Sequence, residues 1–202
     1  MNGVQYEGGG KMNTVVTSRE AILAACRQTV ASSGLSALNM REIAAQCHVA
    51  VGSIYHYFPS KAELMGAAVQ DIWQYIFHAA SQNQGPAGFT EYVGWIYSLA
   101  RQGEQEFPRF FSEHALGFTQ GGRHKARERM ENCFSHMKSG LLAVLQRDPA
   151  VDPRAFGEQF TREGFVDFVF SSLLACLAQG KEDCKFLLEV LRRVLYPHNV
   201  GE

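Results

Sequence analysis

Three helix-start signals follow one another closely near the N-terminal end of this sequence. In each, a residue whose side chain can accept a hydrogen bond is followed three positions later by glutamate, which is the pattern of a capping box. The pairs are Thr17 with Glu20, Asn39 with Glu42, and Ser60 with Glu63. Gly34 and Pro59 stand where the preceding helices would end. The signals predict short helices from 17, from 39 and over 51–58, then a long helix over 61–81. Short helices joined by a tight turn are typical of a helix-turn-helix unit.

The third of these predicted helices divides its residues between two faces. Val51, Ile54 and Phe58 share the face that we expect to be buried. The outer positions are Gly52, Ser53 and His56, flanked by Tyr55 and Tyr57. Small residues let a helix backbone approach a DNA groove, and tyrosine hydroxyls can reach phosphates from the sides. The pattern therefore favours a recognition helix, although an amphipathic helix with surface aromatics would show the same alternation.

Lys61 occupies the first turn of the predicted long helix. The helix dipole disfavours a cation there by roughly a few tenths of a kcal/mol. An anion bound at that point would resolve the conflict, because the helix amides and the ammonium would both face it. A DNA phosphate fits this role, and a solvated surface lysine is the alternative.

The segment 39–64, N-M-R-E-I-A-A-Q-C-H-V-A-V-G-S-I-Y-H-Y-F-P-S-K-A-E-L, resembles the TetR family of bacterial transcriptional regulators, and the similarity extends over about 17–68. The resemblance implies DNA contacts by residues of two kinds. Phosphate contacts are implied for Asn39, Tyr55, Tyr57 and Lys61. Contacts with base edges are implied for Arg41, Val51 and Ser53, with close backbone approach at Gly52 and with His56 open between base and backbone.

The segment also departs from the family pattern at three positions. His48 stands where a glycine is usual in the turn, and it can still adopt a left-handed conformation. Ala50 stands where Ser or Thr often caps the recognition helix, a loss of about 1 kcal/mol. Asn39 replaces the usual hydroxyl cap and should still cap.

The remainder of the chain reads as helix throughout, so the sequence predicts an all-α protein of about nine helices. The expected later helices cover 88–104, 107–118, 122–147, 153–179 and 182–196, separated by Gly and Pro joints. We divide the chain into an N-terminal extension (1–16), a helix-turn-helix DNA-binding domain (17–65) and a helical domain (66–202). In the TetR family the last of these binds effectors and dimerises.

Aromatic side chains are dense in this second domain, and we expect some of them to line a ligand pocket between helices. The candidate pocket residues are Trp73, Phe77, Trp95, Phe110, Phe111, His114, Phe118, Phe134, Phe165 and Phe168. Any one of these rings could instead belong to a plain hydrophobic core. His114, within an aromatic stretch, or Asp167 could orient a ligand.

The last two predicted helices carry apolar residues around most of their circumference, from Phe165 to Ala178 and from Phe186 to Leu195. A helix that is apolar on all sides must be covered on both. We therefore expect a homodimer that packs these helices around a two-fold axis.

Composition narrows the remaining possibilities. With 46% hydrophobic and 19% charged residues, the chain has the balance of a globular protein, and its net charge of −1 does not by itself indicate DNA. We expect a cytoplasmic protein, since neither a signal peptide nor a bilayer span is evident. No cofactor is implied. Cys133 and His136 can share a helix face, but two ligands are too few for a metal site.

Three classes of function remain at this point. The first is a ligand-responsive repressor that binds a palindromic operator. The second is a DNA-binding protein controlled by a protein partner or by oxidation of Cys47, which lies beside the recognition helix. The third, an all-helical enzyme, lacks a nucleophile constellation or an acid–base cluster, and it would leave the helix-turn-helix pattern unexplained.

Overall fold

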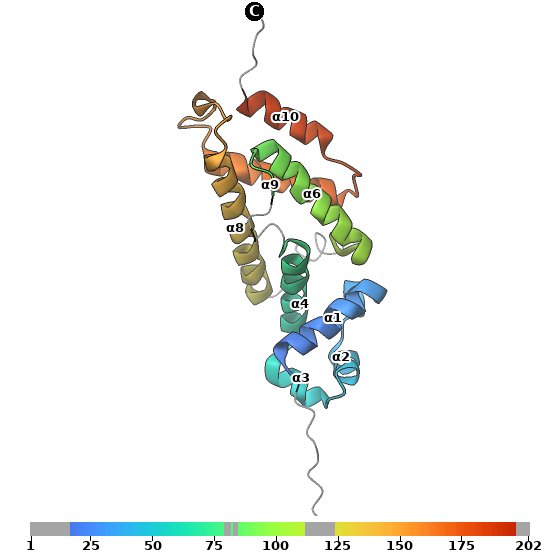
Figure 1. Cartoon of the computed structure of the whole chain (residues 1–202). Helices are drawn as coiled ribbons and strands as arrows, with labels where there is room; N and C mark the ends of the chain where they lie inside the picture. Colours follow the sequence, from blue (N-terminus) through green and yellow to red (C-terminus); the bar gives the residue numbers. More distant parts are fainter. Residues whose placement is uncertain (1–16, 79–81, 83–84, 112–123, 197–202) are drawn as a thin grey trace, which may run out of the picture.

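The computed structural model describes residues 17–78, 82, 85–111 and 124–196 of the chain. These residues form eight α-helices and two short 3-10 helices, with no strand among them, which confirms the all-α prediction. The small helices α1 to α3 lie at one end of the molecule, and α6, α8, α9 and α10 lie at the other (Figure 1). Helix α4 joins the two ends. No helix in the described part is long and apolar enough to cross a bilayer.

Helix α1 (Arg19–Ser33) is capped one residue later than predicted. The Ser18 hydroxyl accepts a hydrogen bond from the Ala21 amide at 3.1 Å, while Thr17, the predicted cap, has a buried side chain. Both residues carry a hydroxyl, so the sequence alone did not separate them. The helix ends as predicted at Gly34, whose φ of 82° is readily available to glycine.

The turn between α2 (Met40–Gln46) and α3 (Val51–Tyr57) has the predicted chemistry. The Asn39 side chain caps α2 by accepting hydrogen bonds from the Arg41 and Glu42 amides at 3.1 and 2.9 Å. His48 adopts the left-handed conformation, with φ of 55°. Ala50 starts α3 without any side-chain cap, which leaves this short helix dependent on its packing.

Helix α4 (Lys61–Ile76) begins at the predicted cap, where the Ser60 hydroxyl accepts a hydrogen bond from the Glu63 amide at 3.2 Å. It ends five residues before the predicted 81, at a C-cap on Phe77. The core of the first region joins α1 to α4 through fully buried side chains. These are Ile22, Cys26, Val30, Leu38, Ile43, Ile54, Phe58 and Leu64.

The second region contains α6 (Phe89–Glu106), α8 (His124–Arg147), α9 (Arg162–Ala178) and α10 (Lys185–Leu195). Most of the predicted helix over 107–118 lies outside the described residues. The helix predicted over 153–179 is wrong in its first part, because α9 begins only at Arg162. Asp152 caps a separate 3-10 helix (Pro153–Ala155), and Gly157 and Phe160 then exchange backbone hydrogen bonds before Thr161 caps α9.

Asp148 ties together three elements of this second region. Its carboxylate accepts hydrogen bonds from the Phe89 amide, the Tyr196 hydroxyl and the Ala150 amide at 2.8, 2.8 and 2.9 Å. Burial alone would raise the pKa of Asp148, but these three donors outweigh burial and hold the pKa below its ordinary value. The carboxylate therefore fastens the start of α6 and the end of α10 to the end of α8.

Candidate nucleic-acid interface and helical pocket

Helix α3 presents the two faces that its sequence predicts. Ile54 and Phe58 are completely buried, and Val51 is half-buried against the same core. Tyr55, which is 49% exposed, and His56 lie on the outside. A Cβ atom added at Gly52 would meet nothing within 4 Å, so the backbone at the start of α3 is open to close approach. Ser53 is half-buried beside it.

Tyr57 differs from the expectation drawn from the resemblance. Its hydroxyl donates a hydrogen bond to the Thr17 carbonyl at 2.7 Å, and its ring is half-buried. A phosphate oxygen needs a donated proton, and this proton is already used within the protein. Tyr57 therefore anchors α3 to the segment just before α1, and contact with phosphate would require that anchor to break.

Three further predicted contact residues lie around α3. Asn39 uses its side-chain oxygen as the α2 cap, which leaves its amide nitrogen available to donate. Arg41 is exposed on α2, and Lys61 is exposed in the first turn of α4. The surface thus combines a small-residue helix start with two exposed cations, an arrangement suited to a polyanion.

Arg19 is a residue that the sequence reasoning missed. Its guanidinium lies over the Phe58 ring, 4.5 Å from the ring centroid, just after the end of α3. This cation–π contact and the Tyr57–Thr17 hydrogen bond both fix α3 to the start of α1. The pairing joins residues far apart in sequence, so no local pattern indicated it.

A cavity of about 620 Å³ lies between α4, α6, α8 and α9. Its volume is in the range of sites for drug-sized ligands. Its lining from α4 and the residues just after that helix is Gln70, Trp73, Gln74, Phe77 and His78. Its lining from α6 is Tyr92, Ile96, Tyr97 and Ala100. Its lining from α8 is Asn132, Cys133, His136, Met137, Gly140 and Leu141, and from α9 it is Phe170, Leu173, Leu174 and Leu177.

Two of the predicted pocket residues, Trp73 and Phe77, line this cavity with stacked rings whose centroids are 5.3 Å apart. Phe110, Phe111 and Phe134 do not border it. They pack edge-on against Trp73, with centroid distances of 6.1, 5.2 and 5.6 Å, and so support the wall rather than form it.

Other predicted pocket residues lie elsewhere. Trp95 packs against Tyr92 outside the lining, and Phe165 packs against Phe89 and Phe156 in the core. Phe168 is 53% exposed on the outer side of α9. Asp167 is exposed and forms a 2.8 Å ion pair with Lys138 rather than facing the cavity. His114 and Phe118 lie outside the described residues.

The polar part of the lining was also missed. Gln74, His78, Asn132 and His136 are exposed residues of the cavity lining, whereas the aromatic and aliphatic lining residues such as Trp73 are mostly buried. Their spacing held a usable signal, because Gln74/His78 and Asn132/His136 are each four residues apart. What sequence could not supply was that α4 and α8 face each other.

Sulfur chemistry and metal binding find little support at these sites. Burial raises the pKa of the thiols of Cys47 and Cys133, which keeps them protonated and weakly nucleophilic. Among the residues that the structure describes, no three His, Cys, Asp or Glu side chains are grouped closely enough to hold a metal ion.

Comparison with known proteins gives the helix-turn-helix region its assignment. Residues 22–68 match the family model described as bacterial regulatory proteins, tetR family. The helix-turn-helix region of the chain is therefore of the TetR-family type. A curated relative, the HTH-type transcriptional repressor KstR of Mycolicibacterium smegmatis, is 36% identical over 74 residues, which cover 37% of this chain. The aligned part spans only 36% of the length of KstR.

Solved structures extend the likeness of fold beyond the helix-turn-helix region. The reduced form of NemR from E. coli superposes with a TM-score of 0.66 at 16% identity, covering 90% of this chain and 98% of NemR. A tetR-family transcriptional regulator from Streptomyces coelicolor superposes with a TM-score of 0.60 at 16% identity, covering 87% of this chain and 78% of that one. At such identities the likeness concerns the fold.

Proposed function

We propose that this TetR-family transcriptional regulator is a ligand-responsive repressor that acts in the cytoplasm, binds a palindromic operator as a homodimer, and is released by a small, largely apolar effector. The domains would divide at about residue 65, with DNA binding in 17–65 and effector binding and dimerisation in 66–202.

The position of α4 carries this proposal. The helix starts at Lys61, directly after α3 and its exposed outer face, and its second half supplies Trp73 and Phe77 to the cavity wall. In Figure 1 it runs from the small helices to the opposite bundle. In a dimer, a change in the tilt of α4 would change the spacing between the two α3 helices. An effector that fits only one tilt would shift the equilibrium between tilts, and the size of that shift is limited by the difference in its affinity for the two.

Exposed apolar side chains on α9 and α10 support the dimer. Phe168 is 53% exposed on α9, while Phe186 and Val194 are 84% and 37% exposed on α10. Large apolar side chains that are exposed to this extent often mark a protein–protein interface. A second copy, related by a two-fold axis, would cover them with the same residues of its own surface.

Control by thiol oxidation receives less support. The thiol of Cys47 is the candidate sensor, and burial raises its pKa, which lowers the reactive thiolate fraction. The comparisons name repressors and regulators rather than enzymes, so the enzyme alternative is also disfavoured.

A salt titration of operator binding tests the DNA surface. Lys61→Ala should weaken binding to all duplexes alike and reduce the slope of log K against log salt by about 0.9. Lys181→Ala, which removes an exposed lysine between α9 and α10, is the matched control and should leave the slope unchanged. An unchanged slope in Lys61→Ala would remove this residue from the interface.

Arg41→Ala tests sequence readout in the same assay. Loss of a bidentate contact with guanine should cost about 1–3 kcal/mol on the operator and relax the preference at one symmetric pair of positions. If every operator variant loses affinity equally, Arg41 contacts only the backbone.

A further inference from the structure

The cavity lining has an exposed polar part and a buried apolar part. Gln74, His78, Asn132 and His136 are exposed, whereas Trp73 and Phe77 are 2% and 7% exposed. A ligand that matches this gradient carries an apolar body and a hydrogen-bonding group at one end. The wall can hydrogen-bond such a group through amides and imidazoles, each able to donate or to accept.

The charge of the lining restricts the ligand further. No lysine, arginine, aspartate or glutamate is found among the described residues that border the cavity. The Tyr97 hydroxyl donates to the Lys181 carbonyl at 2.6 Å, and burial raises the pKa of Tyr97 to about 12, so its phenol stays neutral. A charged group placed against the buried rings of the cavity would lose hydration without gaining a counter-ion from the described lining.

The shape of the buried apolar part favours rings. Trp73 and Phe77 stack with an interplanar angle of 18° and form part of the wall. Phe110, Phe111 and Phe134 hold Trp73 edge-on from other sides. A rigid aromatic wall of this kind contacts a flat ring over a large area at little entropic cost.

We propose that the cavity selects an uncharged, ring-bearing compound, with its ring system against Trp73 and Phe77 and one neutral hydrogen-bonding substituent among Gln74, His78, Asn132 and His136. The inference rests on the proposed function only in taking this cavity as the effector site. It narrows the ligand class, because it disfavours carboxylates such as fatty acids, and organic cations, for which the described lining provides no carboxylate, ammonium or guanidinium counter-ion.

Three compounds of nearly equal shape test the charge requirement. They are para-phenylphenol, which is neutral, para-phenylbenzoate, which is an anion, and para-phenylbenzylammonium, which is a cation. Isothermal titration calorimetry with the full chain should show para-phenylphenol binding at least tenfold more tightly than either charged analogue. Equal or tighter binding of a charged analogue would overturn the proposal, as would no binding of para-phenylphenol up to its solubility limit.

Gly140 provides the control for location. It lines the cavity, and a Cβ atom added there would meet nothing within 4 Å. Gly140→Phe should place a ring in the cavity and weaken para-phenylphenol binding at least tenfold, whereas the matched Gly140→Ala should bind nearly as the parent chain does. Undiminished binding by Gly140→Phe would show that the compound sits elsewhere, and the proposal would then be wrong.

The two proposals fail in different ways. If the ligand class is wrong, charged analogues will bind. If the proposed function is wrong, para-phenylphenol will bind with the expected selectivity while operator affinity, measured by fluorescence anisotropy, does not change.

Discussion

The first region, with α3, and the second region, with the cavity, differ in the sequence separation of the contacts that support them. Tyr57 anchors α3 to Thr17, 40 residues away. In the cavity region, Asp148 reaches Phe89 over 59 residues and Tyr97 reaches Lys181 over 84. The first region is small and closed around fully buried side chains such as Phe58, while the second encloses about 620 Å³ of space. A few long-range ties can hold helices around a void that side chains do not fill.

The largest expected effect comes from truncating one ring in each region. Phe58→Ala should cost about 3–5 kcal/mol of the free energy of unfolding, because it opens a new cavity in a filled core. Phe77→Ala should cost about 1–2 kcal/mol less, because one side of its ring already faces the cavity and loses few contacts. Guanidinium unfolding at a fixed protein concentration measures both. Equal losses would mean that the two regions are packed alike.

Asp148→Asn should come next, with a loss of about 1.5–3 kcal/mol. The carboxylate accepts hydrogen bonds from three donors. The NH2 group of asparagine cannot accept a hydrogen bond, so at least one of these donors would lose its partner. Asp183→Asn is the matched control, since Asp183 is exposed and pairs only near the start of α10, and it should cause no measurable loss.

The same residue gives the second region a pH dependence. Because the folded pKa of Asp148 lies below its ordinary value, its contribution is present above the unfolded pKa and is lost as pH falls through the folded pKa. The Asp148→Asn chain should lack this component of acid destabilisation. An identical acid titration of stability in both chains would contradict the role given to this carboxylate.

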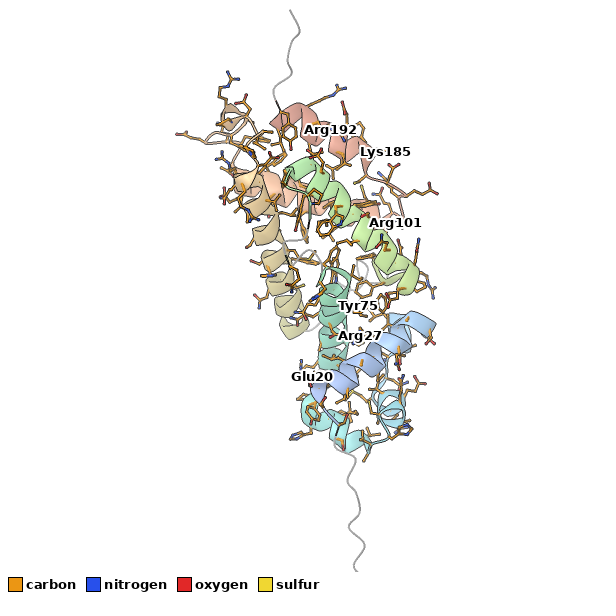
Figure 2. All side chains as sticks on the ribbon, in the orientation of Figure 1. Glu20, Arg27, Tyr75, Arg101, Lys185 and Arg192 are labelled. Carbon is orange, nitrogen blue, oxygen red and sulfur yellow. The ribbon has the colours of Figure 1, made fainter. Side chains whose placement is uncertain are left out.

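A smaller effect concerns the junction between the two regions. Arg27 of α1 forms an ion pair with Asp71 of α4 and lies over the Tyr75 ring, 5.5 Å from its centroid (Figure 2). Arg27→Ala should cost about 1 kcal/mol of stability. It should also reduce the effect of a bound compound on operator affinity, while the affinity for the compound in the absence of DNA is kept.

Arg101→Ala is the control for that variant, because Arg101 pairs with Glu104 within α6 and does not link the regions. If Arg27→Ala and Arg101→Ala leave the response to the compound equally intact, the Arg27 contact does not transmit it.

The smallest effect is a gain. Ala50→Ser supplies the side-chain cap that α3 lacks, at a residue that is exposed and already extended, with φ of −66° and ψ of 147°. It should raise stability by about 0.5–1 kcal/mol in thermal unfolding. No gain would indicate that the packing of Ile54 and Phe58 alone sets the position of α3.

The range of supporting contacts also explains what could be predicted from the sequence. The Asn39 and Ser60 caps, the stop at Gly34 and the two faces of α3 follow from neighbours within a few residues, and the structure contains all of them. The late start of α9 was missed because the reciprocal hydrogen bonds of Gly157 and Phe160 have no strong local signature.

The structure contains a cavity between helices, but only Trp73 and Phe77 of the predicted pocket residues line it. Phe77 and Phe110 are chemically the same, and only the tertiary packing places one at the cavity and the other behind Trp73. Sequence identified ring-rich helices, whereas the position of Phe110 depends on its contact with Trp73 of α4, which is distant in sequence. The exposed polar part of the lining, with His78 and His136, was not predicted, because only the packing of α4 against α8 brings these residues to one cavity.

The central claim is that α4 couples the proposed DNA-binding surface to the cavity, and one linkage measurement tests it directly. An operator is first selected from random duplexes by the full chain. The affinity for that operator is measured with and without saturating para-phenylphenol, and the affinity for para-phenylphenol is measured with and without the operator. The account predicts that each partner weakens binding of the other by the same factor, well above one. The account would be contradicted if both partners bind but neither affinity changes in the presence of the other partner.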